Sequence, residues 1–240
     1  METKYASNAV TVAAKAKARQ EASTVFLAKV FNWMAVGLGL TGLVAWLAAD
    51  TGLALTIARS PLNIVLLLAE LGVVFYLSAR IDKIQPLTAT GLFFGYALLN
   101  GLTLSVIFLI YTRASIAGTF LITSAMFGTM SIYGMVTKRD LTGLGSFMFM
   151  GLIGIILASL VNIFLGSSIL DLAISVIGVL VFVGLTAYDV QKIKMMGEQG
   201  IMGQGEGAIR KGAILGALAL YLDFINLFLM LLRLFGGRRD

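Results

Sequence analysis

The chain has 240 residues, of which 59% are hydrophobic and only 12% are charged, and its formal net charge is +6. So few polar side chains cannot coat a water-soluble globule of this size, which excludes a soluble protein and predicts an integral membrane protein. Cysteine and histidine are both absent, which excludes disulfides, thiolate chemistry and imidazole as a metal ligand or base.

The apolar segments are continuous and do not alternate with period two, so they predict membrane helices and not a barrel. About 20 apolar residues cross the hydrocarbon layer. Runs of this size lie at residues 26–49, 62–79, 87–111, 116–136, 142–166, 170–189 and 212–235. The sequence therefore predicts an all-α, polytopic membrane protein with seven transmembrane helices.

The polar segments divide the chain around this transmembrane domain, which we place at residues 25–235. Residues 1–24 are predicted to be a retained polar tail, mobile or weakly amphipathic, because the run that follows is too long for a signal peptide. Residues 236–240 form a short basic tail. Residues 195–212 are rich in glycine and predict a flexible connector between the sixth and seventh runs.

The distribution of positive charge predicts the orientation. With seven spans, thirteen of the eighteen Lys and Arg residues lie on the same side as the N-terminus, which we therefore expect to be cytoplasmic. The last run leaves an alternative open, because a re-entrant segment would return Arg233, Arg238 and Arg239 to that side. We prefer a full span, since residues 212–235 are long enough to cross the bilayer.

Two aspartates inside the apolar runs are the main candidates for a functional site. Asp189 ends the sixth run in "GLTAYDVQKIK", and Asp223 lies in the middle of the seventh in "LALYLDFINLFLMLLR". A charged Asp at a helix centre costs about 2.5–3.5 kcal/mol on insertion scales, so such residues normally face the interior of a bundle. Two carboxylates in one desolvated site would switch with physiological pH. Arg80 is the candidate cation that locks the ionised pair, and protonation would release this gate.

Other polar residues in the runs have less specific interpretations. Glu70, Asn100 and Asn226 are possible additional lining of a polar pathway, although asparagines also join helices by hydrogen bonds. The two aspartates, too, have a purely structural alternative as hydrogen-bonding groups. Asp189 and Asp223 fall well short of the roughly six to eight oxygens of a tight Ca²⁺ site, so we expect only weak, transient Ca²⁺ coordination.

An aspartate pair is also typical of intramembrane aspartyl proteases, in which two carboxylates activate water. Those enzymes carry G-x-G-D at the second aspartate and a Pro-Ala-Leu motif further on. Here "LYL" precedes Asp223, and the only prolines are Pro61 and Pro86. We therefore expect no enzyme, and we expect neither a cofactor nor a nucleic-acid partner.

Four stretches together resemble the Bax inhibitor family, also called the transmembrane BAX-inhibitor-motif family. They are "LNGLTLSVIFLIYT" (99–112), "FGTMSIYGMVTKRDLTGLGSFMFMGLIG" (127–154), "VFVGLTAYDVQKIK" (181–194) and "LALYLDFINLFLMLLR" (218–233). The resemblance implies a seven-helix fold with the last helix central. It also implies a proton-sensitive Ca²⁺ leak in which Asp189 and Asp223 form the sensing pair and Arg80 is the latch.

The same resemblance gives two expectations about function. The first is a pH-sensitive Ca²⁺ or cation leak channel, with Ca²⁺ as the permeant ion. The alternative is an interaction protein, because some bacterial members bind and modulate a membrane-bound AAA protease, and eukaryotic members are associated with restraint of cell death. The absence of Cys, the short tails and the "YDVQKIK" form favour a bacterial member in the cytoplasmic (inner) membrane. The 195–212 segment departs from the family in its length and glycine content.

Overall fold

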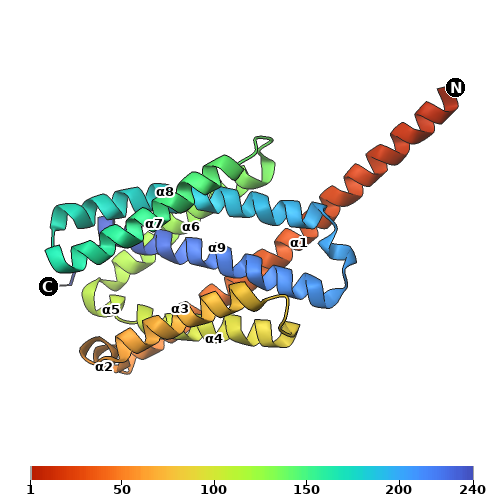
Figure 1. Cartoon of the computed structure of the whole chain (residues 1–240). Helices are drawn as coiled ribbons and strands as arrows, with labels where there is room; N and C mark the ends of the chain where they lie inside the picture. Colours follow the sequence, from red (N-terminus) through yellow and green to blue (C-terminus); the bar gives the residue numbers. More distant parts are fainter. Residues whose placement is uncertain (1, 240) are drawn as a thin grey trace.

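In the computed structural model the backbone is described over residues 2–239, and the side chains over residues 14, 15 and 17–239. This part of the chain is almost entirely helical, which confirms the all-α prediction (Figure 1). Its elements are α1 (Glu2–Asp50), α2 (Leu53–Arg59), α3 (Leu62–Arg80), α4 (Pro86–Leu104), α5 (Ile107–Ile110), α6 (Arg113–Val136), α7 (Thr142–Leu165), α8 (Ser168–Glu198), the 3-10 turn η1 (Ile201–Gly203) and α9 (Glu206–Phe235).

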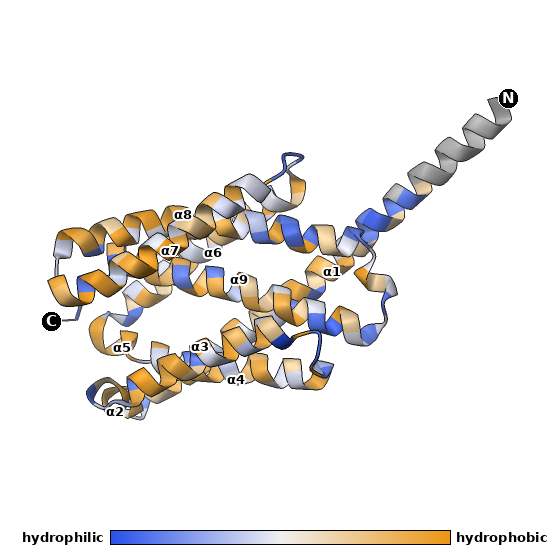
Figure 2. Cartoon of the chain, viewed as in Figure 1, coloured by the Kyte–Doolittle hydropathy of each residue, from blue (hydrophilic) through white to orange (hydrophobic). Residues whose placement is uncertain are grey.

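Seven stretches within residues 2–239 are helical, long and apolar enough to cross a membrane, and each matches one predicted run. They are Lys17–Asp50, Leu62–Arg80, Pro86–Ile110, Arg113–Val136, Thr142–Leu165, Ser168–Glu198 and Glu206–Phe235. Figure 2 shows that these helices consist mostly of hydrophobic residues and that hydrophilic residues gather toward the helix ends. Phe164, for example, is 89% exposed and Ile169 is 80% exposed. The protein is a multi-pass integral membrane protein with these faces toward lipid.

The last helix, α9, is the centre of the bundle, as predicted. In its apolar stretch 72% of the residues are buried, compared with 6–44% in the other six membrane helices. It packs against α1, α4, α6 and α8, and Figure 1 shows it running between these helices. Because it has almost no lipid face, every polar group on α9 must be satisfied by protein or left without a partner.

The C-terminus shows that α9 crosses the whole bundle, so the re-entrant alternative is wrong. The backbone N–H of Thr112 donates to the carbonyl of Gly237 at 3.0 Å, and that of Arg239 donates to the carbonyl of Ile110 at 2.9 Å. These bonds hold the C-terminal residues at the end where α6 begins. We call it the far end, and we call the opposite end, which holds Arg80 and the start of α9, the basic end.

The predicted flexible connector at residues 195–212 is wrong in its extent. α8 continues to Glu198 and α9 starts at Glu206, which leaves only residues 199–205 between them. Gly197 stays helical and allows α8 to pass close to α1, because a Cβ there would lie 2.5 Å from the Cα of Ser23. At the same end of the molecule, residues 2–24 of the predicted tail are part of the helix α1.

Glycine contacts fix how α6 and α8 lie against each other. A Cβ on Gly134 of α6 would collide with the backbone carbonyl of Ala187 on α8. A backbone atom cannot move aside as a flexible side chain does, so this close approach requires glycine. It also sets the level of the two helices, because Val136, the last residue of α6, then lies level with Asp189 of α8.

We predict that Gly134→Ala destabilises the protein, because inserting a methyl group into a closely packed interface costs about 1–3 kcal/mol. Gly128→Ala on the same helix is the matched control, since its Cβ would meet nothing within 4 Å and both changes gain the same helix propensity. Thermal unfolding in detergent measures the difference. Equal melting temperatures for the two variants would contradict this packing.

Candidate functional site

Asp223 is the most unusual polar residue of the core. It lies on α9, is only 4% exposed, and its Oδ2 atom has no hydrogen-bond partner within residues 2–239. A buried acceptor without a partner costs about 1–3 kcal/mol, and more if it is charged. Such a group is rarely retained for stability alone, which marks it as a candidate for function.

The contacts between α8 and α9 place Asp223 along the bundle. Cβ atoms added to Gly216 of α9 and Gly178 of α8 would lie 3.3 Å from Ile193 and 2.8 Å from Met230, respectively. The two helices are therefore antiparallel, with Asp223 level with Leu185 and Thr186. Asp189 lies three to four residues further along α8, which is about one helical turn or roughly 5 Å.

The structure thus brings the two predicted aspartates onto facing helices about one turn apart. Asp189 is half-buried and lies at the level where α6 ends, nearer the basic end, while Asp223 lies deeper. The carboxylates are close enough for the charge of Asp189 to act on Asp223. This arrangement can repel, share a proton or attract a cation.

The predicted latch, Arg80, does not lie at this pair. It is exposed at the end of α3, which packs on α4 at the edge of the bundle, and it makes no ion pair within residues 2–239. The cation that acts on Asp189 is Lys192, three residues further along α8. Its spacing, in "YDVQK", is the i,i+3 spacing of a same-face helical pair, and that signal was available in the sequence.

A second buried oxygen shares the level of Asp223. Ser131 on α6 is 4% exposed, and its Oγ atom also lacks a hydrogen-bond partner in the described chain. The Gly134 and Ala187 contact places Ser131 level with Gly184, one to two residues along α8 from the level of Asp223. Sequence reasoning missed Ser131, because nothing in its local pattern separates it from other small residues of α6.

The opposite face of α9 carries a second polar cluster. Asn100 of α4 donates from Nδ2 to Oε2 of Glu70 at 3.1 Å, and Thr103 donates to Oε1 of Glu70 at 2.5 Å. Tyr221 of α9 donates to Oδ1 of Asn100 at 3.0 Å. The predicted residues Glu70 and Asn100 are therefore joined to each other and to α9, but not to the aspartate pair.

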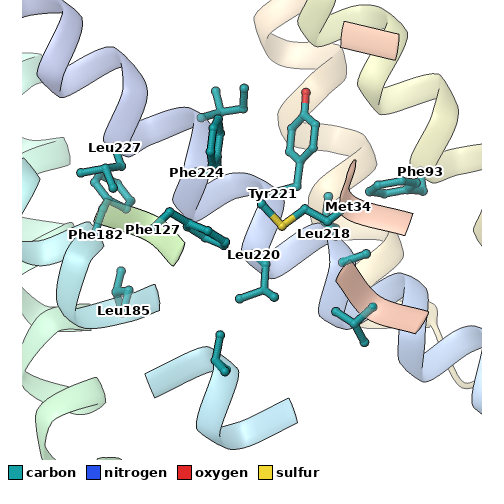
Figure 3. Close-up of a cluster of buried hydrophobic side chains, with 14 of the residues drawn as sticks. Met34, Phe93, Phe127, Phe182, Leu185, Leu218, Leu220, Tyr221, Phe224 and Leu227 are labelled. Carbon is teal, nitrogen blue, oxygen red and sulfur yellow. The ribbon is translucent and has the colours of Figure 1, made fainter. Parts of the chain in front are cut away.

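This cluster continues from Tyr221 to α1. The hydroxyl groups of Tyr221 and Thr41 lie 2.6 Å apart, and Thr41 also contacts the carbonyl of Ala97 at 2.9 Å. The rings of Phe93 and Tyr96 pack edge-on against Tyr221, with centroids 6.1 and 5.5 Å away. Figure 3 shows Phe93 on this side of α9, and Phe127 and Leu185 on the other.

Asn226, the remaining predicted polar residue, bonds within its own helix. Its Nδ2 donates to the carbonyl of Leu222 at 2.8 Å. It therefore neither joins α9 to a neighbour by this bond nor belongs to the Tyr221 cluster. Because its amide N–H is already bonded to the backbone of α9, the half-buried Asn226 is a poor candidate for lining an ion pathway.

A cavity of about 800 Å³ opens at the far end of the molecule. Asp171, Asn162 and Ser175 contribute polar groups to it, and Arg233 and Arg238 contribute positive charge. Between this cavity and Asp223 the side chain of Met230 lies against Gly178. Met230 is seven residues from Asp223 on α9, about 10 Å along the axis, so an apolar contact separates the two.

The basic end is tied together by backbone contacts to α8. Gln191 donates to the carbonyl of Arg139 at 2.8 Å and accepts from the N–H of Leu141 at 2.9 Å, which fixes the connection between α6 and α7. In that connection Asp140 accepts hydrogen bonds from Thr142, which lower the pKa of its carboxyl. Gln191, two residues from Asp189 on α8, therefore holds the connection between α6 and α7 in place.

Within the described residues no three acidic side chains gather as metal ligands. A cation at the aspartate pair would meet the two carboxylates and would need water for its other ligands. The residues present fit a transient cation better than a resident one.

Seven membrane helices around a buried central helix with an unpartnered carboxyl define a polytopic membrane protein whose candidate site is a buried aspartate pair. Residues 23–240 match the family described as inhibitor of apoptosis-promoting Bax1, and the chain belongs to this family. The predicted resemblance is confirmed.

Bacterial relatives are similar over nearly their whole length. The chain is 56% identical to the inner membrane protein YbhL of Escherichia coli, over 89% of this chain and 92% of that one. It is 47% identical to an uncharacterized protein of Borreliella burgdorferi, over 90% and 93%. It is 45% identical to an uncharacterized protein of Deinococcus radiodurans, over 90% and 91%.

We predict that Asp223→Leu stabilises the folded protein by about 1–3 kcal/mol, because it removes a buried oxygen that has no partner. Asn226→Leu is the matched control three residues away, since its amide is already bonded to Leu222 and its loss brings no such gain. Thermal unfolding of both variants in detergent measures the effect. A lower melting temperature for Asp223→Leu would mean that the carboxyl is stabilised in the fold.

Proposed function

We propose that this protein is a passive Ca²⁺ or cation leak of a bacterial inner membrane, controlled by proton binding to Asp189 and Asp223. The observation that carries the proposal is the buried, unpartnered Oδ2 atom of Asp223 on the central helix α9, about one turn from the level of Asp189 on α8. A group left unsatisfied in a closed bundle is available to a proton or a passing cation.

The order of polar groups along the bundle supports a pathway. From the basic end an ion would meet half-buried Asp189 and then Asp223 one turn deeper, at about the level of Ser131 on α6. Beyond these oxygens Met230 covers Gly178, and the far-end cavity begins. In this proposal the structure corresponds to a closed state of the leak, because an apolar contact interrupts the path.

Proton binding would act on the contact between α8 and α9. Lys192 attracts the ionised Asp189 on its own helix, while the two carboxylates repel each other across the interface. Protonation of Asp189 removes both effects, whereas protonation of Asp223 removes only the repulsion. Either one changes the balance of forces between the two helices. Since Met230 of α9 closes the path against Gly178 of α8, a shift between these helices opens it.

We predict a Ca²⁺ leak into dye-loaded liposomes that rises from about pH 8 to about pH 6, and loses its pH dependence in Asp223→Asn and Asp189→Asn. The amide keeps the size of the side chain but cannot ionise. Asp50→Asn is the matched control, because Asp50 is an exposed aspartate at the far end, paired with Arg113 at 3.5 Å. Its leak should equal that of the wild type.

If both site variants leave flux and its pH dependence unchanged, the aspartates are not the sensor. If folded, inserted wild-type protein shows no flux at any pH, the leak itself is wrong and the interaction protein becomes the better reading. One observation favours that alternative: Lys17, Arg19, Gln20 and Glu21 form exposed helical turns at the basic end, accessible to a membrane partner such as an AAA protease.

We predict that Met230→Ala raises the leak several-fold at about pH 8, where the wild type is closed, because it shortens the side chain that covers Gly178. Met150→Ala is the matched control, since Met150 is 62% exposed on the outer surface of α7. The same liposome assay measures both variants. An unchanged leak in Met230→Ala would show that the closing contact lies elsewhere.

A further inference from the structure

The cluster around Tyr221 has fewer hydroxyl protons than contacts. Tyr221 and Thr41 carry one hydroxyl proton each, yet they make three close contacts: with Asn100, with each other, and with the Ala97 carbonyl. Each hydrogen bond needs one proton between its two oxygens. If Tyr221 donates to Asn100, only the proton of Thr41 is left for the other two contacts.

One arrangement directs every donor toward an ionised Glu70. Thr41 donates to Tyr221, Tyr221 donates to Oδ1 of Asn100, and Nδ2 of Asn100 donates to Glu70. The carbonyl of Ala97 then keeps only its bond within α4. Four side chains from α1, α9, α4 and α3 form one chain of donors that ends on the carboxylate.

The reverse arrangement fits the same atom positions. A protonated Glu70 donates to Asn100, whose amide is turned over so that its NH₂ group donates to Tyr221. Tyr221 then donates to Thr41, and Thr41 donates to the Ala97 carbonyl at 2.9 Å. All of these contacts are now filled. Amide oxygen and nitrogen are assigned from the hydrogen-bond network, so both orientations agree with the geometry.

We infer that Glu70 is a second proton-binding site of this protein, and that the hydrogen-bonded chain from Glu70 to Thr41 reverses its donor direction when Glu70 takes up a proton. The Asn100 amide is the element that turns over. Because Tyr221 is part of this chain, the hydrogen bonding of the central helix α9 changes when Glu70 on α3 is protonated. This inference does not rest on ion conduction.

Within the described residues no cationic side chain pairs with Glu70, so a proton is what can neutralise its carboxylate. The side chain is 6% exposed, and the three ion pairs of the described chain do not include it. The titratable groups that face it are Tyr96 of α4 and Tyr221 of α9. Arg59 is the only ionisable residue of α2 and is exposed, and α1 has none between Lys29 and Asp50.

This site is separate from the aspartate pair. Tyr221 and Asp223 are two residues apart on α9, so their side chains point about 200° apart around the helix. Tyr221 faces Thr41 and Asn100, whereas Asp223 is near Asp189 of α8. A proton bound at Glu70 therefore changes the hydrogen bonds on the face of α9 that carries Tyr221, which is opposite the face that carries Asp223.

Infrared difference spectra of bilayer-embedded protein, recorded between alkaline and acid pH with ring-labelled tyrosine, test this inference. We expect protonated-carboxyl C=O absorption that grows on acidification and includes a component from Glu70. That component is lost in Glu70→Gln and retained in Asp223→Asn, whereas absorption from the aspartate pair persists in Glu70→Gln. We also expect a tyrosine band that changes over the same pH range and is lost in both Glu70→Gln and Tyr221→Phe. Tyr76→Phe on the exposed face of α3 should keep both bands.

Glu70→Gln is suited to this test because its amide can donate to Asn100 as the protonated acid does, so the variant should fold, which an unchanged helical circular dichroism spectrum verifies. A carboxyl band of wild-type size in Glu70→Gln, or no titrating band in the wild type, would overturn the proton site. A tyrosine band that persists in Glu70→Gln would overturn the chain. Since the measurement needs no flux, a protein that shows both bands but no leak contradicts only the proposed conduction.

Discussion

The burial of α9 on every side is the constraint on which the rest of the structure depends. Lipid tails are as apolar as a protein core, so a helix gains little from apolar burial alone in a membrane and needs close packing instead. Gly212, Ala213, Gly216 and Ala217 supply this on the basic half of α9, where all four are buried. On the far half the neighbour supplies it, because Gly178 of α8 accommodates Met230.

A central helix without a lipid face can carry polar groups on both of its sides. Tyr221 and Asp223 are the two polar residues concerned, and they differ in their hydrogen bonding. The Tyr221 hydroxyl belongs to a series of hydrogen bonds that reaches α1, α3 and α4, while the Oδ2 atom of Asp223 has no hydrogen-bond partner within the described residues. Their separation by a single residue means that a rotation or shift of α9 affects both sites together. The same helix also carries Met230, which lies against Gly178 of α8 and closes the path in the proposed leak.

The sequence was sufficient for the features that depend on hydropathy and on single costly residues. Seven apolar runs define seven helices, and Asp223 is conspicuous because a carboxylate in an apolar run is expensive. It was not sufficient for contacts between helices. Arg80 was assigned to the aspartates, but α3 packs on α4 at the edge of the bundle. Glu70, Asn100 and Tyr221 are far apart in the chain, and only the three-dimensional packing joins them. Residues 195–198 are helical and extend α8, although the glycine content predicted a flexible connector. Gly197 is there because α1 passes too close for a side chain, and not because the chain is flexible.

The two acidic sites differ in what proton uptake does to the fold. At Glu70 each donor in the cluster has an acceptor in either proton state, so protonation reverses the direction of the bonds and leaves the packing of α3 and α4 in place. At Asp223 no hydrogen bond compensates a change of charge, and the repulsion from Asp189 acts directly on the spacing of α8 and α9. Proton uptake at Asp223 is therefore expected to displace α8 and α9 relative to each other. Proton uptake at Glu70 is expected to change the direction of hydrogen bonds without moving the helices. The helix common to both sites is α9, which also holds Met230, the residue that closes the path in the proposed leak.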